Sequence, residues 1–319
     1  MRKISLFLAV LFLFLSAASC APSLEAVPEE TKPPVTTTKK PVQTETEEKT
    51  ILQDYDPKED DVINILMIGH SFCYYYVEEL YGIAKAAGVN MKVCNVYYSG
   101  CSIARHWTWW KNNERNYKYF ETDGNGRKQY ESYSLKMCLE QENWDVISFQ
   151  RGSADYPTEK KETTYRQLGD LLNYVKSEFP MSTYYWHHTW AYQVGYDRNG
   201  TVMDTVEKQT ASAKKSKDAA LEYCKDFDLI RIPSGDAWQY ARQDKRVGDV
   251  LCNRGAKSDN YHDGEEGGGQ YLNACVWFET LTGQSCIGNT WRPDTYELGE
   301  AKIAALQQAA HRAVAESRV

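Results

Sequence analysis

Short apolar runs alternate with helical patterns along most of the chain. The first run, residues 63–68, is apolar except for Asn64, which is typical of a strand buried on both faces of a parallel sheet. Four further runs that we interpret as strands lie at residues 91–98, 144–150, 182–188 and 227–233. Helical patterns occur at residues 75–88, 159–179, 204–225 and 298–316, and one more begins at Gly269. The alternation predicts an α/β fold in three layers, with a five-stranded, mainly parallel sheet between helices.

One segment interrupts this alternation. Residues 104–135 are irregular in pattern and rich in both aromatic and polar side chains. Segments of this length without clear periodicity are uncommon inside a compact domain and often cover a binding site. We therefore expect a long insertion or lid beside a cleft.

The first 60 residues differ from the rest of the chain. Arg2 and Lys3 precede an apolar segment and a group of small residues that ends at Cys20, so residues 1–20 resemble a bacterial lipoprotein signal peptide with Cys20 as the lipidated residue. Ala17 stands where such signals more commonly have Leu, which leaves plain secretion open as an alternative. Residues 21–60, rich in Pro, Thr, Glu and Lys, predict a disordered tether before a folded domain at residues 61–319. We expect an exported protein, anchored to a membrane of the bacterial cell envelope at the surface or in the periplasm.

Charge and composition narrow the classes of partner. The net charge is −7 and no long basic run occurs, which argues against binding to nucleic acid. The 23 Tyr and 9 Trp residues exceed what a core alone requires and suit a cleft that stacks on sugar rings. Of the nine cysteines, eight remain after Cys20, and none has the spacing of a metal site. No disulfide, cofactor or metal ion is predicted.

Ser71 stands where the first predicted strand gives way to a helix. The strand ends at Gly69, so Ser71 lies at the carboxyl end of a strand, where open α/β sheets bind their ligands. One interpretation is a helix N-cap, the commonest role of a serine before a helix. The other is a nucleophile presented to a crevice. The segment alone favours the cap.

Asp259 and His262 form a second candidate, late in the chain. A carboxylate beside an imidazole orients the ring and stabilises its protonated form. Together with Ser71, the pair would supply the nucleophile, the base and the orienting acid of acyl transfer. Taken by itself, the pair is more typical of a surface loop.

Four segments, in order, resemble the conserved blocks of the SGNH (GDSL-type) hydrolases. The resemblance covers nearly the whole predicted domain and is strongest to a poorly characterised branch of secreted bacterial proteins with a Gly-x-Ser-Phe start and an Asp-x-x-His end. It implies a flavodoxin-like SGNH hydrolase domain over residues 61–319. The segments are Gly69-His-Ser-Phe72, Ser99-Gly-Cys-Ser102, Phe149-Gln150 and Asp259-Asn-Tyr-His262.

The resemblance implies a role for each matching residue. Ser71 would be the nucleophile, His262 the general base and acid, and Asp259 the residue that holds the imidazole. The oxyanion hole would comprise the N–H groups of Ser71 and Gly100 and the side chain of Gln150. Gln150 departs from the Asn of many members of the family.

A second residue departs from the family pattern, and other residues are candidates for binding the substrate. His70 replaces the usual Asp or Asn beside the nucleophile. We expect His70, His106 and Trp190 as possible substrate-binding residues, although His106 is equally well explained as part of the aromatic insertion. Of the adjacent His187 and His188, we expect one in the core and one lining the cleft.

The sequence thus predicts a serine esterase that hydrolyses an ester, with O-acetyl favoured, on a carbohydrate or a related small substrate. The first alternative is a non-catalytic glycan-binding surface lipoprotein on the same scaffold. The second is a metal-dependent hydrolase that uses His187, His188, Asp259 and His262. An ordinary α/β-hydrolase fits less well, because its nucleophile elbow requires Gly where this chain has Cys73.

Overall fold

The computed structural model describes residues 62–152, 161–255 and 257–318. The predicted signal peptide and tether, residues 1–60, lie outside the described residues. Within the described ranges, no helix combines the length and the apolar character that crossing a bilayer requires.

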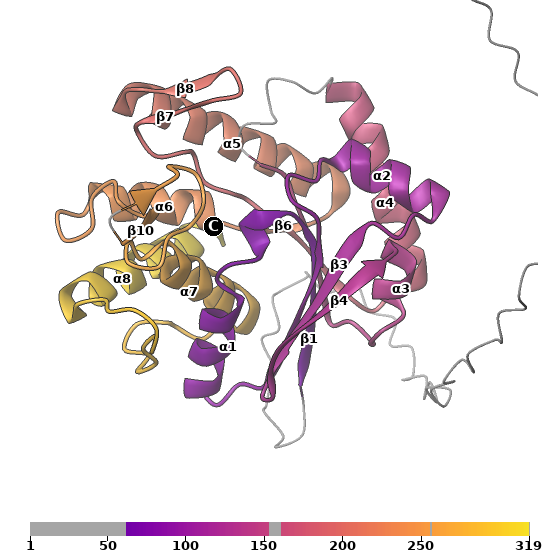
Figure 1. Cartoon of the computed structure of the whole chain (residues 1–319), viewed down its shortest axis with the longest axis horizontal. Helices are drawn as coiled ribbons and strands as arrows, with labels where there is room; N and C mark the ends of the chain where they lie inside the picture. The colour runs from indigo at the N-terminus through magenta and orange to yellow at the C-terminus, as the bar shows by residue number, and fades with distance from the viewer. Residues whose placement is uncertain (1–61, 153–160, 256, 319) are drawn as a thin grey trace, which may run out of the picture. The chain divides into compact units, whose positions relative to one another are not determined.

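A seven-stranded sheet forms the centre of the domain, in the order β4-β3-β2-β1-β5-β6-β9 (Figure 1). Five neighbouring strands of this sheet, in the order β2-β1-β5-β6-β9, pair in parallel. They are the five strands that the sequence predicts. Their order, with the chain crossing outward from β1 in both directions, is that of flavodoxin-like folds and confirms the predicted fold class. The five strands span Ile63–Gly69 (β1), Met91–Tyr97 (β2), Val146–Gln150 (β5), Thr183–His187 (β6) and Ile230–Ile232 (β9).

The predicted irregular lid at residues 104–135 is wrong. Strands β3 and β4 pair antiparallel with each other, and β3 also pairs with β2, so this segment widens the sheet. The sequence pattern of β4 is weak because the strand is exposed or half-buried along its whole length, and Tyr130 and Tyr133 are its side chains that pack against the core. The segment comprises α2 (Ile103–Asn112), β3 (Tyr117–Asp123), β4 (Gly126–Tyr133) and the start of α3 (Leu135–Leu139).

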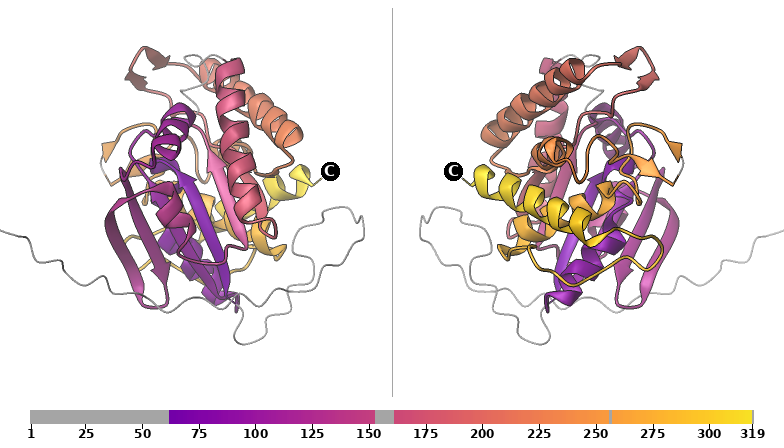
Figure 2. Two further views of the ribbon diagram at one scale, coloured as in Figure 1. Left: turned by 90° about the vertical axis from the view of Figure 1, so that its right-hand side faces the viewer. Right: turned by 90° about the vertical axis from the view of Figure 1, so that its left-hand side faces the viewer.

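Helices cover both faces of the sheet, as the views from either side show (Figure 2). Along β1, Ile65 and Met67 belong to one hydrophobic cluster, whereas Leu66 and Ile68 belong to the other. Both faces are therefore buried, which explains why the run is apolar throughout. One face carries α1 (Val77–Ala86), α6 (Ser234–Gln243), α7 (Gly269–Thr282) and α8 (Glu300–Ser317). The other carries α2, α3, α4 (Lys161–Glu178) and α5 (Val206–Phe227).

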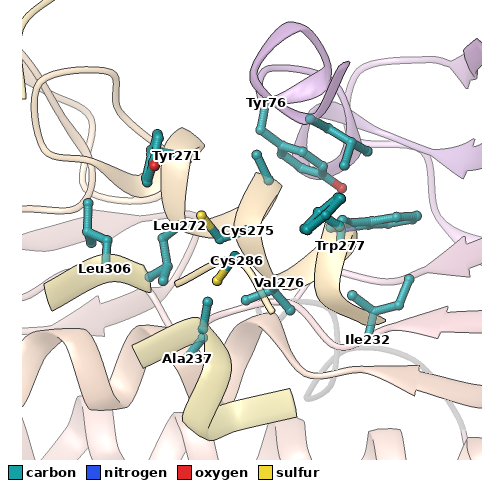
Figure 3. Close-up of a cluster of buried hydrophobic side chains, with 14 of the residues drawn as sticks. Tyr76, Ile232, Ala237, Tyr271, Leu272, Cys275, Val276, Trp277, Cys286 and Leu306 are labelled. Carbon is teal, nitrogen blue, oxygen red and sulfur yellow. The ribbon is translucent and has the colours of Figure 1, made fainter. Parts of the chain in front are cut away.

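Helix α7 is buried on every side. Each of its residues is buried, and Figure 3 shows side chains from α6, β9 and α8 gathered around it. Trp277 lies against Tyr76, with ring centroids 5.9 Å apart. The helix follows the segment of Asp259 and His262, so that segment is joined directly to a fully buried part of the core.

The eight cysteines of the described residues are all free thiols. Seven are buried, in keeping with cysteine acting as a small apolar side chain. Two short antiparallel pairs complete the structure: β7 (Tyr196–Arg198) with β8 (Thr201–Met203), and β10 (Asn253–Arg254) with β11 (Lys257–Ser258).

Candidate active site

Several candidate residues lie at the carboxyl ends of adjacent parallel strands. Ser71 follows β1, Gly100 follows β2, and Gln150 and His187 end β5 and β6. Because parallel strands end at the same edge of the sheet, these residues gather at the position where open α/β sheets bind ligands.

Ser71 opens a short 3-10 helix, η1 (Ser71–Cys73), but does not cap it. The N-cap is His70, whose Nδ1 accepts a hydrogen bond from the Phe72 N–H at 3.4 Å. The interpretation of Ser71 as a cap is therefore wrong. Burial, together with the nearby His262, lowers the pKa of His70 to about 3, so this imidazole stays neutral. The Ser71 hydroxyl is left to make another contact.

Asp259 is held by the turn that it forms with the next three residues. Its Oδ1 accepts hydrogen bonds from the N–H groups of Tyr261 at 3.1 Å and His262 at 2.9 Å, and Asn260 between them adopts a positive φ of 65°. Its Oδ2 lies 2.7 Å from His262 Nδ1. Burial raises the pKa of Asp259, but these hydrogen bonds outweigh burial and hold the pKa below its ordinary value. The carboxylate therefore stays ionised next to the imidazole.

The other nitrogen of His262 meets the predicted nucleophile. His262 Nε2 lies 2.7 Å from Ser71 Oγ, although the two residues are 191 positions apart in the sequence. With Nδ1 donating to Asp259, Nε2 is the nitrogen that accepts the hydroxyl proton. Ser71, His262 and Asp259 thus form one continuous hydrogen-bonded chain, and the structure brings together all three side chains that the sequence singled out.

Two backbone N–H groups at the site have no hydrogen-bond acceptor within the described part of the chain. One is the N–H of Ser71 itself, in the first turn of η1, and the other is the N–H of Gly100. Gly100 is exposed, has a φ of 59°, and faces open space where a Cβ would be. Unpaired N–H groups of this kind are the donors from which oxyanion holes are built.

Gln150 makes contacts at both ends of its amide group. Its Nε2 donates to the His70 carbonyl at 3.2 Å, and its Oε1 lies 3.1 Å from His187 Nδ1. Because the carbonyl fixes the orientation of the amide, His187 carries its proton on Nδ1 and accepts at Nε2 from the Ser234 hydroxyl, 3.0 Å away. Gln150 is buried and supports the backbone that carries Ser71. One of its two amide hydrogens remains for another acceptor.

Trp190 lies under the site and not in it. The side chain is fully buried and stacks between Phe72 and Trp238, with ring centroids 4.6 and 4.4 Å away. Its Nε1 donates to the Tyr261 carbonyl at 2.8 Å. The expectation that Trp190 binds substrate is corrected: it packs against the neighbours of Ser71 and of His262 at once, and thereby fixes their separation.

His106 is buried as well. Its Nδ1 lies 2.8 Å from the Tyr117 hydroxyl, with the two rings stacked, and burial lowers its pKa to about 3. Its second interpretation, as part of the aromatic segment, is the one that the contacts support. His70 and His106 are 4% and 1% exposed, and the Nδ1 atom of each is engaged in a contact within the protein.

Groups that the sequence did not single out surround the His262 ring. Tyr261 and Tyr75 lie 3.9 and 5.1 Å from it, between ring centroids, and both are half-buried. The guanidinium of Arg254 lies 4.2 Å over the Tyr75 ring. Only their nearness to the matched blocks would have drawn attention to them, since an aromatic residue or an arginine in a loop carries no signal of its own.

The histidines of β6 do not form a metal site with the triad. His187 contacts Gln150 and Ser234, whereas His188 contacts Arg231. Both are buried, which corrects the expectation that one of them lines the cleft. Among the described residues, no group of three His, Cys, Asp or Glu side chains is arranged to hold a metal ion.

Comparison with known proteins places the chain in a family and among solved folds. A family described as "Domain of unknown function (DUF4886)" matches residues 64–313. A DUF4886 family protein from Bacteroides uniformis is similar, with 30% identity and a TM-score of 0.71, over 80% of this chain and 95% of that one. Among curated proteins, none matches.

More distant similarities fall among proteins described as SGNH or GDSL-type hydrolases and esterases. An acetyl xylan esterase is 12% identical, with a TM-score of 0.45, over 69% of this chain and 100% of that one. A member of the lipolytic G-D-S-L family from Veillonella parvula is 13% identical, with a TM-score of 0.42, over 69% of this chain and 98% of that one.

Proposed function

Since the chain belongs to the DUF4886 family, whose function is unknown, we propose its activity from the site: it is a serine esterase that acts through Ser71, His262 and Asp259. The observation that carries this proposal is the 2.7 Å contact between Ser71 Oγ and His262 Nε2, backed by Asp259 at 2.7 Å. A buried serine that met no base would not support it. The arrangement has the three roles of an acyl-transfer triad in the required order.

The reaction begins when Ser71 Oγ attacks the ester carbonyl and His262 Nε2 takes the hydroxyl proton. Asp259 stabilises the imidazolium that forms, because its carboxylate is already ionised and hydrogen-bonded to Nδ1. The N–H groups of Ser71 and Gly100 stabilise the negative oxygen of the tetrahedral intermediate, and each such donor contributes about 3–4 kcal/mol to transition-state stabilisation.

The intermediate collapses when the carbon–oxygen bond to the alcohol breaks and His262 returns its proton to the leaving alkoxide. Water then attacks the acyl-enzyme with His262 as base, which releases the acid and restores Ser71. Gln150 supports the loop of Ser71 through the His70 carbonyl, and its remaining amide hydrogen is a third candidate donor to the oxyanion. No cofactor takes part.

We favour an O-acetyl group on a carbohydrate as the substrate. Ser71 is only 6% exposed, which suits a small acyl group. The alcohol side is lined by the rings of Tyr75 and Tyr261, and such rings stack on sugars while their hydroxyls hydrogen-bond to them. A panel of acetylated polysaccharides, with acetate release as the readout, identifies the sugar.

Hydrolysis of p-nitrophenyl acetate tests the proposal. Ser71→Ala is expected to lower kcat by at least about 10⁴-fold, because the nucleophile is lost. Ser177→Ala, which removes an exposed hydroxyl on α4, is the matched control and is expected to retain wild-type kcat. Equal rates in the wild type and Ser71→Ala would contradict the proposal. No turnover of any ester, together with glycan binding, would favour the alternative of a binding lipoprotein.

We also propose that the protein is exported and anchored through Cys20. The proposal rests on the sequence of residues 1–20. Cys20→Ser is expected to move the protein from the detergent phase to the aqueous phase in phase partitioning, whereas Cys224→Ser is expected to change nothing. Retention of Cys20→Ser in the detergent phase would contradict the anchor.

A further inference from the structure

Arg254 ends strand β10, in the hairpin that precedes Asp259. Its guanidinium centre lies 4.2 Å over the ring of Tyr75, whose centroid is 5.1 Å from that of His262. One of its terminal nitrogens donates to the Asp263 carbonyl at 3.2 Å, which fixes the side chain against the segment of the catalytic histidine. A positive charge is thus held one ring away from His262.

Among the described residues, this charge has no carboxylate at ion-pair distance, although it lies close enough to Asp263 to oppose the rise in pKa that burial causes in that carboxyl. Within the described part of the chain Arg254 forms no ion pair with Asp or Glu, and its Nε is buried without an acceptor. Neither of the nearby acidic side chains neutralises Arg254 fully. The Asp259 carboxylate is hydrogen-bonded to His262, and burial raises the pKa of Asp263 to about 7, so that this carboxyl is partly protonated at neutral pH. A buried donor on a charged group is costly unless it is satisfied, so the site favours an added anion.

A second guanidinium approaches the same place. Arg198, on β7, lies 5.7 Å from the ring of Tyr261, which is 3.9 Å from that of His262. Burial raises the pKa of the Tyr261 hydroxyl, and both Arg198 and Arg254 are close enough to oppose that rise. Arg198 is exposed and, in the described ranges, also lacks an ion pair.

Arginines elsewhere show the contrast. Six of them pair with carboxylates: Arg127 with Glu78, Arg231 with Asp236, Arg242 with Asp249, Arg246 with Asp244, Arg292 with Glu300 and Arg312 with Glu316. The chain as a whole carries a net charge of −7, which repels anions. The two arginines beside the catalytic histidine, which form no ion pair with any described residue, therefore make a locally positive region on a molecule that is negative as a whole.

The proposed mechanism assigns this patch to one part of the substrate. His262 must protonate the leaving alkoxide, so the alcohol portion of the ester lies on the His262 side of the site. The acyl portion lies toward the N–H groups of Ser71 and Gly100. Arg254 and Arg198 therefore face the sugar and not the acetyl group.

We propose that Arg254, assisted by Arg198, binds a carboxylate on the alcohol portion, so that the preferred substrate is an acetylated acidic sugar such as a uronic acid residue. This inference rests on the proposed esterase function. A guanidinium presents its N–H groups as a fork that matches the two oxygens of a carboxylate, and such bonds are stronger than those between neutral groups.

The test compares two substrates that differ only in charge. They are mono-O-acetylated methyl glucuronosides and the corresponding glucuronamides, with acetate release measured for each. The wild type is expected to show a kcat/KM about 10- to 100-fold higher for the carboxylates, the range expected of one or two hydrogen bonds to a charged group. Arg254→Gln is expected to bring the ratio of the two kcat/KM values to within about twofold of one, and Arg254→Lys to retain an intermediate ratio.

Arg312→Gln is the matched control, because Arg312 also lies over a tyrosine ring, 3.9 Å from Tyr240, but on α8. It is expected to keep the wild-type ratio. The ratio is measured within each variant, so a general loss of folding does not mimic the result. Equal kcat/KM for the two sugars in the wild type, or an unchanged ratio in Arg254→Gln, would overturn the proposal.

A parallel assay separates this failure from failure of the esterase proposal. If p-nitrophenyl acetate is hydrolysed in a Ser71-dependent manner but the sugars show no charge preference, only the anion site is overturned. If no ester is turned over, calorimetric titration with glucuronate tests the anion site independently of any catalysis. Binding to the wild type but not to Arg254→Gln supports the site, and equal or absent binding overturns it.

Discussion

The side chains of Ser71, Asp259 and His262 are oriented by groups that are next to them in the sequence. His70 takes the capping role that Ser71 would otherwise fill, so the serine hydroxyl is directed to His262. Asp259 is fixed by two backbone N–H groups before it meets the imidazole. The roles of Ser71, Asp259 and His262 were predictable because their segments resemble the SGNH blocks in order, whereas neither segment alone favoured catalysis.

Gly100 and Gln150 were predicted from the resemblance, but the places of Trp190, His106 and His187 were not predictable at this scale. Trp190 and His106 resemble binding residues in a sequence, but whether an aromatic or imidazole ring is buried depends on strands that are distant in the chain. His187, which fixes the orientation of Gln150, was assigned no such role from the sequence. Its function follows only from the pairing of β5 with β6, which puts Gln150 opposite His187.

Asp263, next to His262, yields a prediction about pH. It is fully buried, and burial raises its pKa to about 7, above the ordinary value of about 3.9 that it regains on unfolding. The folded protein therefore binds a proton that the unfolded chain releases, and stability declines as pH rises from about 4 to about 7. Asp263→Asn keeps an acceptor for Asn273, so it is expected to melt several °C higher than the wild type at pH 8, with little difference at pH 4.

Thermal melting of both proteins at the two pH values provides the measurement. Asp244→Asn is a suitable comparison, because hydrogen bonds from Arg246 lower the pKa of that half-buried carboxyl to about 2, in the opposite direction. A gain in melting temperature for Asp263→Asn that is equal at pH 4 and pH 8 would show that proton binding is not the cause.

At the scale of elements, the close approach of β1 to β5 sets the position of the nucleophile. Gly69 ends β1, and a Cβ there would come 2.3 Å from Gln150 Nε2. The strand can therefore pass directly over the amide that supports the His70 carbonyl. A larger residue would displace the loop that carries Ser71.

Gly69→Ala is expected to lower kcat on the order of 10²-fold, the effect of moving a reacting group by about 1 Å, and to destabilise the fold by about 1–3 kcal/mol. Gly299→Ala is the control, since its Cβ would meet nothing within 4 Å. Kinetics on p-nitrophenyl acetate and urea denaturation measure the two effects. Wild-type kcat in Gly69→Ala would show that Gln150 does not position the nucleophile.

The elements show most clearly what sequence patterns can and cannot reveal. Four of the five parallel strands, β1, β2, β5 and β6, were predicted because they are almost wholly buried and read as largely apolar runs, whereas β9, at the edge of the sheet, is recognisable from Ile230 and Ile232. Strand β4 was missed because an exposed antiparallel edge needs no such run, and β3 was missed because polar residues such as Lys118 and Glu121 interrupt its buried positions. Helix α6 was missed as well: it follows β9 almost at once, and its apolar positions, Ala237, Trp238 and Ala241, are few.

At the scale of the whole molecule, the chemistry and the core lie in the part of the chain that begins near residue 62. The family match, residues 64–313, covers the same part. A chain that starts at residue 61 is therefore expected to melt at the same temperature as the full chain and to retain kcat and KM within about twofold. Differential scanning calorimetry and ester hydrolysis check this, and a loss of activity on truncation would assign residues 1–60 a part in the site.

The claim on which the account depends is that Ser71 is a nucleophile activated by His262. The most direct measurement is covalent labelling with a fluorophosphonate, followed by peptide mass spectrometry. The account predicts one adduct, on the peptide that contains Ser71, with labelling absent in Ser71→Ala and slowed by about 10³- to 10⁴-fold in Asp259→Asn. An adduct at another residue, or equal labelling of the wild type and Ser71→Ala, would contradict it.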